Sequence, residues 1–402
     1  MWNTPQVTVL DNGLTVVTVE NDSQLVEVEL CFRAGHLDDE IPGTAHYLEH
    51  LMCEGPDNDS RRRDHLPLIV HGSEMNAQTG LSFTRYYWKG LATFWEEMTR
   101  SLLATTFDAT ADSFERERFT VLEEIRKEAM GQRITDWFRS KVYPHIPLLQ
   151  NPSVGTEESV KSISLEDIRR FYEKWYGAQN AALIVVGGIK HEQVLAVAGK
   201  MTLLSGKKNG LHKHQPVYVK GIFQEMENIN PHMVLYFPRS TIWEERIKMR
   251  TILAMLRDCD MGLAYQRLRN QERLIYGISL DAGGILLPHM GLIVPARSEH
   301  FEKIETIIFE EIDRIIAKKY DPNLLRMIVN CFRISAIKDR EFTSHGEVLD
   351  NARTSWLWSL PYTETKKQED LVATFTPEIL SEAAKEHFRR ERYGCLHFIP
   401  KS

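Results

Sequence analysis

The two halves of this chain echo each other at a nearly constant spacing, and that repetition limits what the chain can fold into. Residues 164–168 (Ser-Leu-Glu-Asp-Ile) lead through a helical stretch to the apolar run 183–186. Residues 376–380 (Thr-Pro-Glu-Ile-Leu) lead in the same way to the run 395–398, 212 residues further on. The duplication of one α/β unit within the chain explains both segments most simply.

A break between the halves is indicated at residues 205–210 (Ser-Gly-Lys-Lys-Asn-Gly), which combine turn-forming residues with charge. A chain of 402 residues is too long for one compact core and suits two domains of about 200 residues each. We therefore expect a first domain over residues 1–205, a linker over 206–214 and a second, duplicated domain over 215–402.

Alternating apolar residues separated by tight turns predict sheets that are mostly antiparallel. Residues 7–10 and 14–19 alternate as strands and are joined by Asp-Asn-Gly at 11–13, a strong hairpin signal. Residues 26–32 form a third strand pattern, and residues 111–130 have helical spacing. The predicted fold class is α+β, with two homologous α/β domains, each a mostly antiparallel sheet packed with helices.

Composition narrows the possible partners. The net charge of −7 and the isoelectric point near 6.1 argue against a nucleic acid or an anionic membrane as the main partner. The five cysteines are odd in number and never spaced C-x-x-C, so the sequence suggests neither a disulfide framework nor a thiolate zinc site. No apolar run approaches the length of a membrane span, and the first residues lack a signal-peptide pattern. We expect a cytoplasmic protein that binds no membrane.

The motif with the clearest chemical meaning lies in residues 43–55. His46 and His50 stand four residues apart with Glu49 between them, in the pattern H-x-x-E-H. On a helix this spacing places both imidazoles on one face, where two ring nitrogens can reach one metal ion at roughly 2.0–2.1 Å. Glu49 flanks that face and is free to handle a proton. The alternative is a polar helix face without a metal, so a third ligand is needed to decide.

A third ligand is available in a later helical stretch. Glu117 and Glu124 are seven residues apart and share one helix face two turns from each other, whereas Glu123 points elsewhere. A solvated acidic face is the competing interpretation of this pattern. The residues alone leave both interpretations open.

These motifs resemble the pitrilysin/insulinase family of inverted zincins, in particular its short two-domain members related to mitochondrial processing peptidase. The resemblance rests on H-x-x-E-H followed some 75 residues later by a glutamate on a second helix. It extends over nearly the whole chain. Further matching stretches are residues 11–14, 33–35, 43–46, 72–79, 84–87, 155–158 and 176–187.

The resemblance implies a role for each residue of the motif. His46, His50 and Glu124 would bind one zinc ion, Zn2+, per chain. Glu49 would be the catalytic base, and Glu117 would support the site from the outer shell. Family members of this type form half of a clamshell chamber.

The same resemblance assigns a substrate-binding edge. Asn76 and Ala77 match the strand that pairs with an extended peptide. Such pairing uses main-chain hydrogen bonds, so binding would depend more on an extended conformation than on one side chain.

The second half carries a further element that resembles the family's R-x6-Y motif. Its Arg269 and Tyr276 would reach the zinc site and stabilise the oxyanion formed during peptide hydrolysis. The match departs from the family at residues 271–273 (Gln-Glu-Arg). Without the resemblance, Arg269 would be interpreted as a surface ion-pair former and Tyr276 as a half-buried core residue.

The duplicated domain lacks a metal face. At the offset of the repeat, Asp258 and Gly262 stand in place of the two histidines, and Ile337 stands in place of the third ligand. We therefore expect one zinc site per chain.

The resemblance implies a zinc-dependent endopeptidase that hydrolyses extended or unstructured peptides inside a closing dimeric chamber. A homodimer would build two composite sites, and a heterodimer with an inactive relative is an alternative. Two other functions remain open. One is a non-catalytic scaffold or partner subunit, and the other is a dedicated maturation protease for one precursor peptide.

Overall fold

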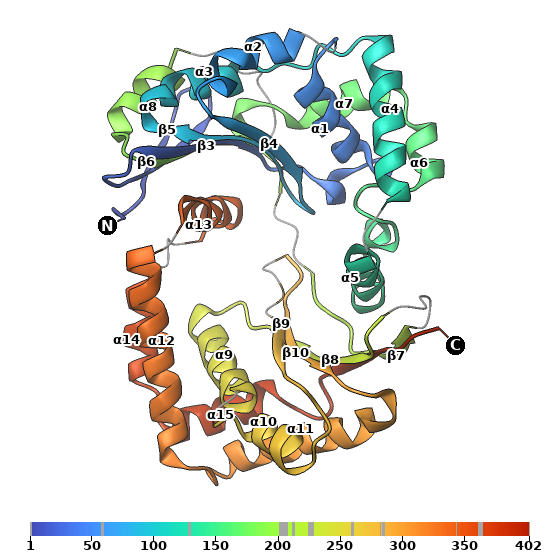
Figure 1. The fold of residues 1–402 in the computed structure, drawn as a ribbon, viewed down its shortest axis with the longest axis vertical. Helices are drawn as coiled ribbons and strands as arrows, with labels where there is room; N and C mark the ends of the chain where they lie inside the picture. Colours follow the sequence, from blue (N-terminus) through green and yellow to red (C-terminus); the bar gives the residue numbers. More distant parts are fainter. Residues whose placement is uncertain are drawn as a thin grey trace. The chain divides into compact units, whose positions relative to one another are not determined.

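The computed structural model describes residues 2–57, 60–127, 130–200, 208–210, 214–223, 229–258, 261–281, 283, 286–342, 344–360 and 365–401. The chain forms two compact units (Figure 1). Unit 1 comprises Met1–Asp136, Ile146–His212 and Arg340–Tyr362, and unit 2 comprises Trp137–His145, Lys213–Asp339 and Thr363–Ser402.

Unit 1 contains a six-stranded sheet in the order β1-β2-β6-β3-β5-β4, in which β2 and β6 are parallel and the other neighbours antiparallel. Its strands are β1 (Gln6–Val9), β2 (Thr15–Glu20), β3 (Leu25–Phe32), β4 (Glu74–Thr79), β5 (Thr84–Leu91) and β6 (Ala181–Gly187). Its helices are α1 (Thr44–Glu54), α2 (Ser60–Ile69), α3 (Trp95–Ala104), α4 (Ala111–Arg126), α6 (Glu157–Ser162), α7 (Leu165–Trp175), α8 (His191–Ala198) and α13 (His345–Trp358).

Both faces of the unit 1 sheet pack against helices. Alternate side chains along its strands point to opposite faces, and apolar residues are buried on each. On β3, Val28 and Leu30 face a core shared with α1, α3, α7 and α8. On the other face, Val17 and Ile184 pack against Leu349 of α13, which comes from the C-terminal half of the chain. Figure 1 shows α13 on the side of the sheet opposite to these other helices.

Unit 2 contains a five-stranded sheet in the order β7-β11-β8-β10-β9, with β7 and β11 parallel and the other neighbours antiparallel. Its strands are β7 (Lys220–Phe223), β8 (His232–Pro238), β9 (Ser279–Asp281), β10 (His289–Pro295) and β11 (Gly394–Phe398). Its helices are α9 (Trp243–Arg257), α10 (Leu263–Tyr265), α11 (Phe301–Ile316), α12 (Pro322–Phe342), α14 (Thr365–Ala373) and α15 (Pro377–His387), and α5 (Met130–Val142) ends in this unit.

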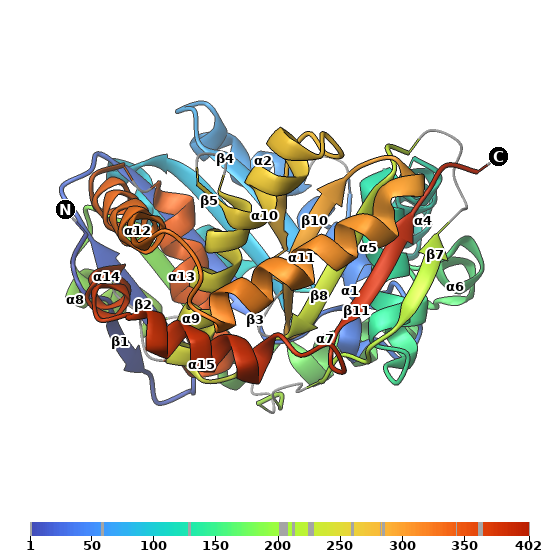
Figure 2. The same cartoon turned by 90° about the horizontal axis from the view of Figure 1, so that it is seen from below.

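The core of unit 2 lies between one face of its sheet and α9, α11 and α15. In Figure 2, α11 crosses in front of β8 and β10. The opposite face receives α5. Trp137 of α5 contacts the rings of Phe223 and Phe398, and Phe138 contacts Tyr236.

The two units repeat one topology, as the sequence predicts. The order β7-β11-β8-β10-β9 matches β2-β6-β3-β5-β4 in position and in strand direction. Each sheet also receives one helix from across the sequence boundary, α13 in unit 1 and α5 in unit 2. The predicted α+β class with two mostly antiparallel sheets is therefore confirmed.

The compact units do not follow the linear boundaries expected at 205 and 215. Two helices, α5 and α13, each contribute their apolar face to a sheet formed mainly by the other half of the sequence, so both units are discontinuous. Much of the expected linker lies outside the described residues, since only 208–210 and 214 are described there.

The offset between the halves also changes along the chain. Leu183 and Cys395 are 212 residues apart, but their partners in the neighbouring strand, Leu30 and Leu235, are 205 apart. An insertion or deletion between these elements accounts for the difference. A single offset therefore assigns wrong counterparts in part of the chain.

This corrects the counterparts assigned to the motif histidines. Asp258 and Gly262 lie beyond the end of α9, which finishes at Arg257. At the offset of 205, the histidines correspond to Thr251 and Met255 on α9, and both are fully buried. Neither is a typical zinc ligand, so the copy on α9 still lacks the motif.

Among the described residues, no helix combines the length and the apolar character needed to cross a lipid bilayer.

Candidate active site

A buried carboxylate fixes the start of helix α1, which carries the H-x-x-E-H motif. Asp39 accepts hydrogen bonds from the backbone N–H groups of Gly43 at 2.9 Å and Ala45 at 2.8 Å. An anion at this end also complements the helix dipole. Gly43 has a φ of +96°, a left-handed conformation that favours glycine.

Apolar side chains hold α1 against the core and so aim its polar face. Tyr47, Leu48 and Leu51 are buried. His46 and His50 project from the other side of the helix, with ring centroids 4.8 Å apart. The spacing of four residues thus produces the shared face expected from the sequence.

Helix α4 brings the acidic residues to α1. Thr110 caps its N-terminus. The Tyr47 hydroxyl donates a hydrogen bond to the carbonyl of Phe114, and the two rings stack with centroids 4.9 Å apart. This contact between the helices sets the register at which Glu117 and Glu124 face the histidines.

Three donor atoms converge at the junction of α1 and α4. His46 Nε2 lies 3.5 Å from Glu124 Oε2, and His50 Nε2 lies 3.3 Å from the same oxygen. One donor atom from each residue lies within 4.8 Å of the others. Ligands at about 2.05 Å from a tetrahedral zinc ion would be about 3.3 Å apart. The donor types suit zinc, and the two distances from the imidazole nitrogens to Glu124 Oε2 are close to this value.

Glu117 lies on the far side of His50 from Glu124. Its Oε2 is 3.8 Å from His50 Nδ1, and its Oε1 accepts a hydrogen bond from Arg116 Nε at 3.1 Å. Its side chain is only 5% exposed. A carboxylate in this place orients the imidazole and increases its basicity, as expected of a residue in the outer shell.

The two histidines have opposite protonation preferences. Burial and then the charge of His50 lower the pKa of His46 to about 4, so His46 is neutral at pH 7. Burial also acts to lower the pKa of His50, but hydrogen bonds to Glu117 and Glu124 and the charge of Glu49 outweigh it and raise this pKa to about 9. A divalent cation at this site would therefore displace a proton from His50.

Glu49 lies beside the three donors and is held by strand β4. The Thr79 hydroxyl donates a hydrogen bond to Glu49 Oε2 at 2.5 Å, and the Thr79 backbone also donates to this carboxylate. Burial raises the pKa of Glu49, whereas these hydrogen bonds and the charge of His50 lower it. The effect of burial is the larger, so the pKa lies above its usual value. A carboxylate with a raised pKa is suited to accept and return a proton.

A cleft of about 860 Å³ opens beside the donors. Its lining combines the motif helix, strand β4, helix α4 and the segment ahead of α6. The lining residues are His46, Glu49, Ala77, Gln78, Thr79, Phe119, Thr120, Glu123, Glu124, Lys127, Ser153 and Val154.

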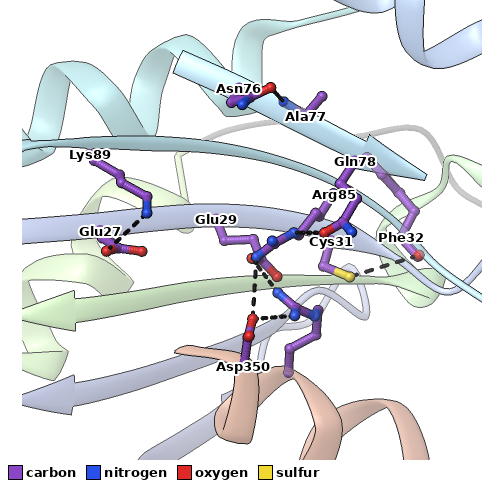
Figure 3. Close-up of polar contacts among 11 residues, drawn as sticks. Glu27, Glu29, Cys31, Phe32, Asn76, Ala77, Gln78, Arg85, Lys89 and Asp350 are labelled. Atoms are coloured by element: carbon purple, nitrogen blue, oxygen red, sulfur yellow. Dashed lines mark hydrogen bonds and ion pairs between the residues drawn. The ribbon is translucent and has the colours of Figure 1, made fainter. Parts of the chain in front are cut away.

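Asn76 and Ala77 lie on the edge strand β4, which ends the unit 1 sheet in the described part of the chain. The Ala77 N–H donates a hydrogen bond to Asn76 Oδ1 at 2.8 Å (Figure 3). The Asn76 side chain thus occupies the position that the carbonyl of an added peptide strand would take.

Sequence reasoning missed two residues that build this site. Asp39 caps α1 and Thr79 holds Glu49. Asp39 lies outside the N-cap position, which Gly43 occupies, so the usual helix-start pattern does not indicate it. Thr79 follows Ala77 by two residues on a strand, so the period of two could have placed both on one face.

The structure places Arg269 and Tyr276 together in unit 2. Arg269 lies in a π-helical turn, Gln266–Gln271, and its Nη1 donates to the carbonyl of Ile275 at 3.2 Å. Its guanidinium lies 5.0 Å from the centre of the Tyr276 ring. Tyr276 is 82% exposed, so it is not the half-buried core residue that the residues alone indicated. The role of the pair toward the zinc site remains a prediction.

Among the described residues, unit 2 has two further groups of possible metal donors, but in each group a glutamate is already paired with a lysine. Glu305, beside Cys395 and His397, binds Lys220 at 2.8 Å. Glu245, beside Glu386 and His387, binds Lys248 at 2.7 Å. Among the described residues, neither group repeats the donor set of α1 and α4. Ile337, which the offset of the repeat places opposite Glu124, lies on α12 and is exposed.

Two models of one protein family match the chain. The model described as "Insulinase (Peptidase family M16)" matches residues 15–141, and the model described as "Peptidase M16 inactive domain" matches residues 162–330. A probable mitochondrial-processing peptidase subunit beta from Arabidopsis thaliana is 31% identical over 208 residues, which are 49% of this chain and 38% of that protein. Cytochrome b-c1 complex subunit 1 from Bos taurus is 25% identical over 201 residues, which are 48% of this chain and 42% of that protein.

The fold is similar to that of a solved structure of a protease from Helicobacter pylori, with a TM-score of 0.82 and 17% sequence identity. The superposition covers 100% of both chains. The matches to the two curated relatives span about two-fifths of their length. Fold and site together define a duplicated α+β protein with an H-x-x-E-H helix. The chain belongs to the insulinase family, peptidase family M16.

Proposed function

We propose that this protein is a zinc-dependent endopeptidase that hydrolyses extended or unstructured peptides. The observation that carries the proposal is the convergence of one oxygen and two imidazole nitrogens, with Glu49 beside them. His46, His50 and Glu124 would hold the ion. Two neutral imidazoles and one carboxylate leave room for a fourth ligand, which is the arrangement of catalytic rather than structural zinc sites.

Bound zinc would polarise the scissile carbonyl and activate the attacking water. Glu49 then accepts the proton of that water and returns it to the departing amine. Thr79 keeps the Glu49 carboxylate aimed into the cleft through its hydroxyl and its backbone N–H. Glu117 holds the ring of His50 from behind. Each of these roles rests on contacts within unit 1.

Strand β4 supports the choice of an extended substrate. The outer edge of β4 faces the cleft, because Ala77 and Thr79 of this edge strand also line the cleft. A peptide that pairs with this edge would place its backbone next to Glu49. Recognition through main-chain hydrogen bonds tolerates many side chains.

We further propose a homodimer in which Arg269 and Tyr276 of one chain serve the zinc site of the other. A heterodimer with an inactive relative is the alternative. The similarity to a processing-peptidase beta subunit and to cytochrome b-c1 complex subunit 1, both named as subunits, supports a multi-subunit assembly. A cytoplasmic location remains a prediction.

A second candidate function is that of a non-catalytic subunit. The similarity to a subunit of the cytochrome b-c1 complex and the match to a model described as an inactive domain favour it. A maturation protease for one precursor peptide shares the proposed chemistry and differs only in substrate breadth. The presence of Glu49 and of three metal donors favours hydrolysis.

The test compares the wild type with Glu49→Gln. We expect the wild type to bind one zinc per chain and to cleave unstructured peptides, and we expect a chelator to abolish cleavage. Glu49→Gln should retain zinc and lose activity by about 10²–10⁴-fold because only the proton acceptor is removed. Metal analysis and mass spectrometry of cleavage products provide both measurements. A zinc-loaded wild type without activity on any peptide would favour the non-catalytic subunit.

A further inference from the structure

We propose that Gln78 is a specificity-determining residue that selects a hydrogen-bond acceptor, acidic or amide, at one position of the bound peptide. The inference rests on the proposed function, because it concerns the peptide that pairs with strand β4. It assigns a chemical class to one substrate side chain next to the reacting bond.

The outer edge of β4 is identified by its backbone hydrogen bonds. Ala77 directs its N–H to Asn76 Oδ1, and Thr79 directs its backbone to the Glu49 carboxylate. Both groups therefore point away from β5. In an antiparallel sheet, the residues between them direct their N–H and C=O groups to the neighbouring strand. A peptide added at this edge pairs with Ala77, and Gln78 stands next to that pair.

The side chains of β4 alternate between two faces. Ala77 and Thr79 lie on the face of α1, where Thr79 reaches Glu49. Asn76 and Gln78 lie on the other face, together with Arg85 of β5 (Figure 3). Residues paired across neighbouring strands have side chains on the same face. The peptide residue opposite Gln78 therefore has its side chain beside the Gln78 amide.

The amide of Gln78 has a fixed orientation. Its Oε1 accepts a hydrogen bond from Arg85 Nε at 3.0 Å. Arg85 Nη1 donates at 3.0 Å to Glu29 Oε2, and Glu29 is fully buried on the central strand β3. Arg353 of α13 donates to the same oxygen at 2.7 Å. This chain of contacts anchors the exposed Gln78 to the interior of unit 1.

Because its oxygen is engaged, Gln78 presents the amide nitrogen, with two N–H donors, to the peptide. Among the described residues, no oxygen accepts a hydrogen bond from this nitrogen. A carboxylate or amide oxygen of the peptide would satisfy it, whereas an ammonium group would meet another donor. Hydrogen bonds to charged acceptors are the stronger ones, so the expected order is acidic, then amide, then apolar, then basic.

Asn76 provides a contrast two residues away on the same face. In the described part of the chain, its Oδ1 accepts a hydrogen bond only from the Ala77 N–H, which a bound peptide would take over. Once released, the Asn76 side chain can turn either its oxygen or its nitrogen to the peptide. We therefore expect a strong preference opposite Gln78 and a weak one opposite Asn76.

The test uses the zinc-loaded full-length protein and a set of extended peptides that carry Glu, Gln, Leu or Lys at each position in turn. We expect one position near the scissile bond at which kcat/KM for Glu exceeds that for Lys by about 10-fold or more. In Gln78→Glu, the new carboxylate still accepts from Arg85 but presents an oxygen to the peptide. The Glu-to-Lys ratio at this position should then fall below one.

The matched control is Gln193→Glu on α8. Gln193 Oε1 also accepts a hydrogen bond, from the Lys190 backbone N–H at 3.2 Å, but the residue does not line the cleft. This variant adds the same charge and should leave the ratio unchanged. A profile without preference in the wild type, or equal shifts in both variants, would overturn the role of Gln78.

A binding measurement separates this inference from the proposed function. Fluorescence anisotropy with Glu49→Gln compares the Glu and Lys peptides without turnover. One outcome is that the wild type cleaves no peptide, while Glu49→Gln binds the Glu peptide about 10-fold more tightly than the Lys peptide. Selection by Gln78 would then stand, and the proposed hydrolysis would not. Equal binding of both peptides would refute the selection.

Discussion

The two histidines of the motif share a helix face but differ in charge, because their surroundings differ. His46 is buried and neutral, with a pKa lowered to about 4. His50 is only partly buried and lies among Glu49, Glu117 and Glu124, which raise its pKa to about 9. In the metal-free protein, His50 is therefore an imidazolium at pH 7, and zinc must compete with its proton.

This difference predicts a pH dependence for the metal-free protein. Because the pKa of His50 in the folded state, about 9, exceeds its usual value of 6.5, its stabilisation is complete below pH 6.5 and is lost as the pH rises through 9. The shift corresponds to roughly 3 kcal/mol. Urea unfolding of chelator-treated protein between pH 6 and 10 measures it.

His50→Gln provides the control for that titration. We expect its unfolding free energy to vary less than that of the wild type over the same range, since the glutamine carries no titrating proton. Parallel curves for the two proteins would show that another group causes the loss.

At the scale of elements, the first turn of α1 depends on a close approach between two loops. Gly43 has a positive φ, and a Cβ there would lie 2.8 Å from the carbonyl oxygen of Val154 and 3.1 Å from the Cα of Gly155. The same loop contributes Val154 to the cleft. The helix start and the cleft wall are therefore coupled.

We expect Gly43→Ala to lower the free energy of unfolding by about 3 kcal/mol and to reduce zinc binding, since both strain and a clash result. Gly72→Ala is the matched control. Gly72 has a φ of +79°, but a Cβ there meets nothing within 4 Å. It should cost only about 1 kcal/mol. Equal losses in denaturant unfolding of the two variants would remove the clash as a cause.

The contact of α13 with the sheet is a second feature at this scale. Glu29 is a fully buried carboxylate bound by Arg353 at 2.7 Å and by Arg85 at 3.0 Å. Burial raises the pKa of Glu29 despite both arginines. Removal of one partner leaves a buried charge poorly compensated.

We expect Arg353→Met to destabilise the protein by about 3 kcal/mol. Adding Glu29→Gln should recover part of this loss because the buried charge is removed together with its partner. Thermal and urea unfolding of both variants measure the coupling. Additive losses in the double variant would contradict the ion pair as the cause.

At the scale of the whole molecule, the proposed chamber assigns Arg269 and Tyr276 to the zinc site of a second chain. This predicts complementation. Each of the variants Glu49→Gln and Tyr276→Phe should have little or no activity. For Tyr276→Phe we expect kcat to fall by about 10²–10³-fold. After the two are mixed, hybrid dimers contain one intact composite site, so roughly a quarter of wild-type activity should return.

The measurement is peptide cleavage before and after mixing, with light scattering to record the dimer. Tyr218→Phe is the control, since Tyr218 is another partly exposed tyrosine of unit 2. No recovery on mixing, with a dimer present, would show that Tyr276 acts within its own chain or not at all.

The sequence predicted the donors of the site because helical periodicity is local. The spacing of His46 and His50 fixes their shared face, and the spacing of Glu117 and Glu124 does the same on α4. Thr79 and Gln78 were not predicted to act. Their partners, Glu49 and Arg85, belong to other elements, and no local pattern encodes that distance.

The sequence by itself determined the repeated topology, the α+β class and the motif helix, because alternation and helical spacing act over a few residues. Only the tertiary structure decided that α5 and α13 exchange between the halves, that the offset shifts from 212 to 205, and which protons the histidines hold. Those properties depend on packing and on charges that meet only after the chain has folded.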